Sequence, residues 1–121
     1  TSNVDAWVDF YRRVMGAKVT GVIESSGTRM VNLDIGGAPI RISDMTGVER
    51  ECSLRTRKRV QPREGYHHLG FLVTDLDAAV DEMVGQGAEV EVPSVKASDY
   101  LRCAFLTLPG GVRIELCERL V

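Results

Sequence analysis

The chain has 121 residues, of which 44% are hydrophobic and 26% charged, and its formal net charge at pH 7 is -2. This length suits one compact domain, or two half-sized modules that share a core and together bury about two-thirds of the unfolded surface. The small net charge gives no general attraction to nucleic acid or to an anionic membrane, and no apolar run approaches the about 18 residues that span a bilayer. We therefore expect a small-molecule substrate, with no nucleic acid and no membrane as partners.

The cysteine content indicates a reducing compartment. The chain has three cysteines, an odd number with no C-x-x-C spacing, which argues against both a disulfide framework and a thiolate zinc site. No secretory leader is visible, although the sequence begins at Thr1 rather than at a methionine. The sequence thus predicts a cytoplasmic protein with three free thiols, at Cys52, Cys103 and Cys117.

The N-terminal part of the chain predicts one helix followed by three strands. Asn3 or Asp5 can cap a helix whose apolar residues recur at helical spacing, and Gly16 ends it. Alternating and β-branched residues then predict three strands, with a hairpin turn at the adjacent glycines of the second connection. The predicted strands are residues 18–24, 28–35 and 38–43.

A basic connector follows, over residues 49–65. Between residues 50 and 63 there are six basic side chains and one acidic side chain. This segment is either a solvated linker between modules or a mouth that attracts an anionic substrate, such as a carboxylate or a coenzyme A phosphate. No aromatic residue is interleaved with these charges, which disfavours a nucleic-acid interface.

The C-terminal half predicts a strand, a helix and three further strands. Leu69, Phe71 and Val73 alternate with other residues, which places His68 on the opposite face of the first strand. The adjacent His67 leaves that register open by one residue. The remaining elements are predicted at residues 77–84 for the helix and at residues 89–92, 101–108 and 112–117 for the strands.

The two halves repeat one pattern. Residues 36–42, GGAPIRI, are echoed by residues 110–116, GGVRIEL, and the two predicted helices lie at matching positions before them. The strand that begins at His68 has no counterpart in the first half, where it would fall before Thr1. We therefore predict an upstream strand that begins with a metal-binding side chain. The modules are expected to be residues 1–48 and 66–121, within a single domain of residues 1–121.

Several motifs resemble the glyoxalase, bleomycin-resistance and dioxygenase superfamily, also called the vicinal oxygen chelate superfamily. Residues 68–77 (HLGFLVTDLD), 87–90 (GAEV) and 109–116 (PGGVRIEL) resemble its second half, and residues 3–19 resemble its first half. Residues 65–71, GYHHLGF, resemble the corresponding strand of methylmalonyl-coenzyme A epimerases. The resemblance implies an α+β fold of two tandem βαβββ modules, which form a curved, partly open, mixed-sheet cup around a divalent metal, and it implies a homodimer.

The resemblance also implies the metal ligands. In the family they come from the first and fourth strands of each module, which gives His68 and Glu115 in the second module. In the first module the first strand would lie upstream of Thr1, and the fourth strand offers Arg41 where glutamate or glutamine is expected. A guanidinium has no lone pair to donate, so Arg41 cannot be a ligand. The metal itself, Zn, Ni, Co, Mn or Fe(II), is not specified by the sequence.

Three functions follow from this resemblance. The first is lyase or isomerase chemistry, in which a base removes a proton beside a carbonyl and the metal stabilises an enediolate. The second is extradiol dioxygenase chemistry, because a missing histidine with His68 and Glu115 would form a two-histidine, one-carboxylate face for iron(II). The third is a drug- or metabolite-binding protein of the resistance type, with little or no metal, in which Arg41 holds an anionic ligand.

Further side chains are candidates for binding and catalysis. The alternation of the last strand places Glu115 on one face with Arg113 and Cys117, and we expect these two neighbours to line the substrate site. Glu115 is the metal ligand of this set, or else it pairs with an arginine, Arg41 or Arg113. Other candidates are Glu24 as a proton-transfer base, or an exposed turn residue, and two tyrosines that donate to a substrate oxygen or pack at the rim, Tyr66 and Tyr100.

Overall fold

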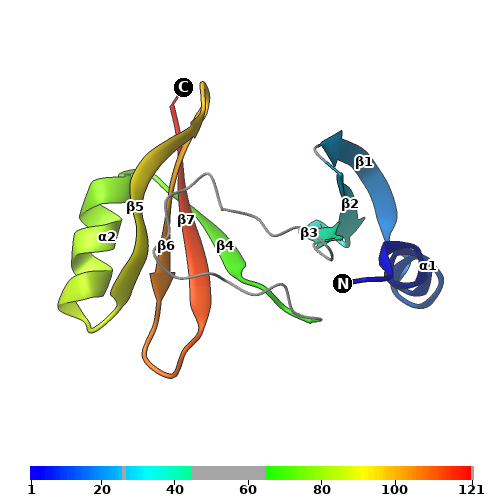
Figure 1. Ribbon diagram of the computed structural model, residues 1–121, viewed down its shortest axis with the longest axis horizontal. Helices are drawn as coiled ribbons and strands as arrows, with labels where there is room; N and C mark the ends of the chain where they lie inside the picture. The colour runs from blue at the N-terminus through cyan, green and yellow to red at the C-terminus, as the bar shows by residue number, and fades with distance from the viewer. Residues whose placement is uncertain (26, 45–64, 121) are drawn as a thin grey trace. The chain divides into compact units, whose positions relative to one another are not determined.

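The computed structural model describes residues 1–25, 27–44 and 65–120. The described residues form two compact units, one with residues 1–25 and 27–44 and the other with residues 66–120 (Figure 1). The predicted basic connector, apart from Gly65, and Cys52 lie outside the described residues. No helix in the described part of the chain is long and apolar enough to cross a membrane.

The first unit is a helix packed on a three-stranded antiparallel sheet. Its strands run in the order β1-β2-β3, and α1 contacts β2 and β3. The elements are α1 (Val4–Met15), β1 (Lys18–Ser25), β2 (Thr28–Ile35) and β3 (Ala38–Ser43). The predicted order of one helix and three strands is therefore confirmed, and each predicted strand end agrees to within one residue.

Local sequence explains the ends of α1 and the β2–β3 turn. The Asn3 side chain accepts a hydrogen bond from the Ala6 backbone N–H at 3.1 Å, which satisfies one of the free amides at the start of the helix. Gly16 ends the helix in the left-handed conformation, with φ of 66°. Gly36 and Gly37 have φ of 60° and 93°, as a tight hairpin turn with two left-handed residues requires.

The second unit has the order βαβββ. Its sheet runs β4-β7-β6-β5, in which β4 is parallel to β7 and the other neighbours are antiparallel. The elements are β4 (Leu69–Val73), α2 (Leu76–Gly85), β5 (Glu89–Ser98), β6 (Leu101–Thr107) and β7 (Arg113–Arg119). His68 directly precedes β4. The parallel β4–β7 pair brings the start of the second unit beside its last strand, so residues far apart in sequence become neighbours.

One predicted boundary is wrong by more than two residues. We expected the strand after α2 to end at residue 92, before Pro93, whereas β5 continues to Ser98. A proline donates no backbone hydrogen bond, but β5 is the edge strand of its sheet, where the missing donor breaks no ladder. The pairing of β5 with β6 also shifts register at three places, so it accommodates residues that a regular ladder would not.

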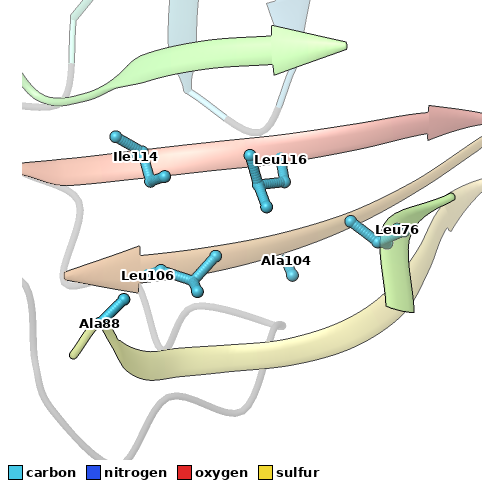
Figure 2. Close-up of a cluster of buried hydrophobic side chains, with 6 residues drawn as sticks. All are labelled: Leu76, Ala88, Ala104, Leu106, Ile114 and Leu116. Carbon is cyan, nitrogen blue, oxygen red and sulfur yellow. The ribbon is translucent and has the colours of Figure 1, made fainter. Parts of the chain in front are cut away.

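The core of the second unit lies between α2 and one face of the sheet. Side chains from the start of α2, the turn after it, β6 and β7 form a buried cluster (Figure 2). Its members are Leu76, Ala88, Ala104, Leu106, Ile114 and Leu116. Because β6 and β7 alternate, their intervening residues lie on the other face, which is free of α2.

The N-cap of α2 is expected to contribute about 1 kcal/mol to the free energy of unfolding. The Asp75 carboxylate accepts a hydrogen bond from the Ala78 backbone N–H at 3.0 Å. Asp75→Ala removes this acceptor, whereas Asp75→Asn keeps an oxygen at the same place. Urea unfolding should show the loss for alanine and most of the stability retained for asparagine. Equal losses for both variants would show that the cap hydrogen bond is not the cause.

Candidate metal site

The face of the second sheet opposite α2 carries the polar residues of the candidate site. On β7, Ile114 and Leu116 point into the core, so Arg113, Glu115 and Cys117 share the opposite face, as the alternation predicted. The β6 residues paired with these three are Thr107, Phe105 and Cys103, respectively. Gly70 of β4 lies beside Glu115 on the other side. The face of the sheet opposite α2 therefore brings together groups from β4, β7 and β6.

His68 and Glu115 meet on this face. His68 Nε2 is 3.3 Å from Glu115 Oε2, and the side chains are 29% and 24% exposed. A charge-assisted hydrogen bond between nitrogen and carboxylate is usually about 2.7–2.9 Å long, so this pair is not tightly closed. At Gly70 an added Cβ would lie 3.7 Å from Glu115 Oε2, so the glycine keeps this side of the carboxylate open.

The His68–Glu115 pair fits two ligands of one divalent ion. Imidazole nitrogen and carboxylate oxygen are both ligands that zinc and neighbouring transition metals accept, at about 2.0–2.2 Å. Two such donors at octahedral or tetrahedral angles lie about 2.8–3.6 Å from each other, a range that contains the observed 3.3 Å. Among the described residues, no group of three or more His, Cys, Asp or Glu is arranged to hold a metal ion. His68 and Glu115 are therefore two candidate ligands in this part of the chain.

Two thiols stand beside Glu115. Cys103 and Cys117 are cross-strand partners on β6 and β7, and both are free thiols. Burial raises the pKa of each thiol to about 11, and the Glu115 carboxylate contributes to this rise through its charge and a hydrogen bond. Both thiols are therefore neutral near pH 7. We expected Cys117 to contact substrate. In the structure its thiol forms a hydrogen bond with Glu115, the candidate metal ligand.

The raised pKa of these thiols predicts slow alkylation. In a Cys52→Ser background only Cys103 and Cys117 react, and at pH 8 their thiolate fraction should be about 100-fold below that of a thiol with the ordinary pKa of 9.0. The rate with iodoacetamide, followed by mass spectrometry, should keep rising until about pH 11. A plateau near pH 9 in folded protein would contradict the assigned environment.

The same thiols predict a loss of stability at high pH. Unfolded thiols lose their protons around pH 9.0, whereas the folded thiols hold theirs until about pH 11. Their contribution to stability is therefore complete below pH 9 and is lost as the pH rises toward 11. Urea unfolding at several pH values should show this decline, and Cys117→Ala should reduce it. An unchanged decline in that variant would assign it to other groups.

Arg113 belongs to a network that sequence reasoning missed. Its Nε donates to Glu91 Oε2 at 2.6 Å, and Thr107 Oγ1 donates to Glu91 Oε1 at 2.5 Å. The guanidinium carbon lies 4.3 Å from the centre of the Phe105 ring, in a cation–π contact. Glu91 thus forms an ion pair with Arg113, for which the sequence had offered Glu115 as the partner. Glu91 lies within the first register shift of the β5–β6 ladder, between Val90 and Val92, and reaches Arg113 across β6.

His67 and His68 have different surroundings. His67 Nδ1 lies 3.2 Å from Arg113 Nη1 and 2.7 Å from His68 Nδ1. The pKa of His67 is lowered, first by burial and then by the Arg113 charge. The His68 ring stands edge-on to Phe105, with centroids 5.3 Å apart. Of the two histidines, His68 therefore directs its Nε2 at Glu115, which resolves the register that the sequence left open.

The remaining predicted site residues are divided between the two units. In the first unit, Arg41 Nε donates to Asn32 Oδ1 at 2.8 Å, and Glu24 Oε1 is 3.8 Å from Arg29 Nε. In the second unit, Tyr66 and Tyr100 are 96% and 78% exposed. Tyr100 precedes β6, and Phe105 beside His68 lies well along that strand. The second unit therefore brings together His68, Glu115, Arg113 and Cys117, but it does not bring Tyr100 to them.

The chain is similar to a known family over nearly its whole length. The family model described as the Glyoxalase/Bleomycin resistance protein/Dioxygenase superfamily matches residues 1–116. No curated protein matches the chain significantly. The family match agrees with the motifs on which the resemblance was based, namely the His68 strand, the Gly87 turn and the last hairpin.

Solved structures show the same fold. A hypothetical protein from Bacillus halodurans C-125 has a TM-score of 0.72 at 23% identity, over 98% of this chain and 87% of that one. Methylmalonyl-CoA epimerase from Mycobacterium tuberculosis has a TM-score of 0.64 at 23% identity, over 98% and 81%. Methylmalonyl-CoA epimerase from Streptomyces coelicolor, in complex with 2-nitronate-propionyl-CoA, has a TM-score of 0.65 at 28% identity, over 98% and 88%. The predicted α+β glyoxalase-type fold is confirmed.

Proposed function

Because the chain belongs to the glyoxalase/bleomycin resistance protein/dioxygenase superfamily, we propose that it is a metal-dependent enzyme that moves a proton beside the carbonyl of a small molecule. The observation that carries this proposal is the 3.3 Å approach of His68 Nε2 to Glu115 Oε2. The 28% identity to an epimerase solved with a coenzyme A ligand supports an acyl thioester as the substrate class.

His68 and Glu115 are the proposed ligands of a divalent ion. Such an ion would act as a Lewis acid and would stabilise negative charge that develops on a carbonyl oxygen of the substrate. The thiols of Cys103 and Cys117 hold the Glu115 carboxylate by hydrogen bonds, and burial raises the pKa of each thiol to about 11. The Phe105 ring packs against His68 and limits its rotation.

The proton-moving groups are proposed from residue chemistry. Glu24 has a side chain that is 74% exposed and only a 3.8 Å ion pair with Arg29, so its carboxylate is free to accept a proton from a bound substrate. Tyr66 has an exposed hydroxyl that can donate to a substrate oxygen, and Tyr100 is the second candidate for that role. Arg41 is the proposed contact for a substrate anion.

The test is metal-dependent exchange at the carbon beside a carbonyl. The full-length protein, stripped with a chelator and reloaded with Zn²⁺, Co²⁺, Ni²⁺ or Mn²⁺, is incubated with 2-substituted acyl-CoA thioesters in D₂O. Mass spectrometry should show deuterium in the substrate with at least one metal and none in the stripped protein. Glu24→Gln should abolish exchange while metal binding persists. Metal-loaded protein that exchanges no proton in thioesters or in other α-substituted carbonyl compounds would rule the proposal out.

Arg41 favours a second candidate, an extradiol-type dioxygenase. The guanidinium cannot ligate, and its Nε is engaged by Asn32 Oδ1 at 2.8 Å. A metal held by His68, Glu115 and a histidine of the predicted upstream strand would then have the facial arrangement of non-haem iron(II) oxygenases. This candidate predicts oxygen uptake with catechols in the presence of Fe²⁺, whereas the first predicts no oxygen demand. Protein that binds no metal but retains a small molecule would instead indicate sequestration.

A further inference from the structure

The contacts of Arg113 determine which atom of His67 carries a lone pair. A guanidinium has only N–H donors and no acceptor. Arg113 Nη1 lies 3.2 Å from His67 Nδ1, so this nitrogen accepts from Arg113. If His67 Nδ1 carried a hydrogen instead, two N–H groups would face each other at that distance. The arrangement therefore requires an unprotonated Nδ1 on His67.

The contact with His67 Nδ1 then determines which nitrogen of His68 carries the proton. His67 Nδ1 and His68 Nδ1 are 2.7 Å apart, a separation that requires a hydrogen between the two nitrogens. Because His67 Nδ1 is the acceptor, His68 Nδ1 is the donor. In a neutral imidazole a proton on one nitrogen leaves the lone pair on the other, which here is Nε2.

That lone pair faces Glu115. His68 Nε2 is 3.3 Å from Glu115 Oε2, so two electron-rich atoms are aimed at the same point. We infer that Arg113 and His67 are positioning residues that fix His68 in the tautomer with a free Nε2, ready to bind the metal. This inference rests on the proposed function, because it assigns a purpose to the orientation of a proposed ligand. A hydrogen bond at the far nitrogen of a ligand histidine is a known way to orient such ligands.

Arg113 is itself held in place. Its side chain is only 14% exposed. Glu91 accepts a hydrogen bond from its Nε, and the Phe105 ring lies against its guanidinium. Thr107 in turn donates a hydrogen bond to Glu91. A cation anchored in this way donates to His67 from a constant position. The relay therefore runs from the β5 carboxylate through Arg113 and His67 to His68.

The first test reads the tautomer directly. Residues 1–121 contain two histidines, His67 and His68, and comparison with the His67→Phe spectrum assigns their rings in two-bond proton–nitrogen NMR correlations of ¹⁵N-histidine-labelled, metal-free, full-length protein. At a pH at which both rings are neutral, His68 should be protonated at Nδ1 and not at Nε2. His67→Asn retains an oxygen acceptor and should keep this pattern, whereas His67→Phe retains a ring without an acceptor and should shift it toward Nε2–H. A wild-type His68 protonated at Nε2, or a pattern indifferent to His67→Phe, would overturn the inference.

The second test measures metal affinity with Zn²⁺ alone by competition with a chromophoric chelator. His67→Phe should weaken binding by about 10–100-fold, as removal of an orienting group around a metal ligand does, and His67→Asn should restore most of it. Arg113→Gln should weaken binding to a similar extent. Arg102→Gln is the matched control, because Arg102 pairs with Asp77 and Glu118 away from the site, and it should leave the affinity unchanged.

The two proposals fail separately. If the wild-type protein takes up no Zn²⁺, the proposed function is wrong. The NMR spectrum of the metal-free protein would still show which tautomer His68 adopts. Wild-type protein that binds Zn²⁺ no more tightly than His67→Phe does would leave the proposed function standing and overturn the relay.

Discussion

Glu115→Gln is expected to weaken the binding of Zn²⁺ or Co²⁺ by more than about 100-fold, because it replaces a charged ligand, whereas loss of an orienting group alone costs about 10–100-fold. The amide keeps the size of the side chain, so the fold around it should survive. Competition with a chromophoric chelator measures the affinity, and cobalt adds a visible spectrum that reports the ligand set. The charge, rather than the volume, of residue 115 is what this variant changes.

Glu118→Gln is the matched control for this variant. Glu118 lies on the same strand as Glu115 but on the other face, where its carboxylate is 3.1 Å from Arg102 Nη1. Its loss should leave metal affinity unchanged. Glu115→Gln also has a second readout, since removal of the carboxylate should lower the raised pKa of the Cys103 and Cys117 thiols. Equal metal affinity in Glu115→Gln and Glu118→Gln would exclude Glu115 as a ligand.

Leu116→Ala is expected to cost about 2–5 kcal/mol of the free energy of unfolding. Leu116 is 1% exposed and packs in the cluster between α2 and the sheet (Figure 2). Its truncation leaves a cavity that the neighbouring side chains fill only in part. Because Glu115 is the adjacent residue on β7, the variant should also weaken metal binding through strand displacement. Urea unfolding measures the stability change.

Two further variants make this prediction specific. Leu106→Ala, in the same cluster and fully buried, should cost a similar amount. Val112→Ala changes a side chain that is 50% exposed and should shift stability by less than about 0.5 kcal/mol. A Leu116→Ala protein as stable as Val112→Ala would contradict the assignment of Leu116 to the core.

The fold could be predicted from the sequence because its signals are local and repeated. Helical spacing, a cap at Asn3 and glycine turns such as Gly36–Gly37 each depend on residues close together in the sequence, and the structure places them as expected. The end of β5 could not be predicted, because Pro93 is a strand breaker in general and is tolerated only at an edge. Edge position is a property of the whole sheet.

The candidate site could be predicted in part. Alternation along β7 gives the shared face of Arg113, Glu115 and Cys117, and the family pattern adds His68. The contact of Glu91 with Arg113 could not be predicted, since it reaches across β6 and Glu91 lies within a register shift of the β5–β6 ladder. The roles of the two histidines likewise depend on which ring lies against Arg113. Cross-strand register, rather than residue type, separates the predicted part of the site from the rest.

The central claim is that His68 and Glu115 bind one divalent ion, and metal analysis tests it most directly. The full-length protein is purified without chelators and analysed by inductively coupled plasma mass spectrometry beside His68→Ala and Glu115→Gln. We predict about one equivalent of a divalent transition metal per chain in the wild type and a loss in both variants. Wild-type protein that carries no such metal, even after incubation with Zn²⁺, Co²⁺, Ni²⁺, Mn²⁺ and Fe²⁺, would contradict the claim.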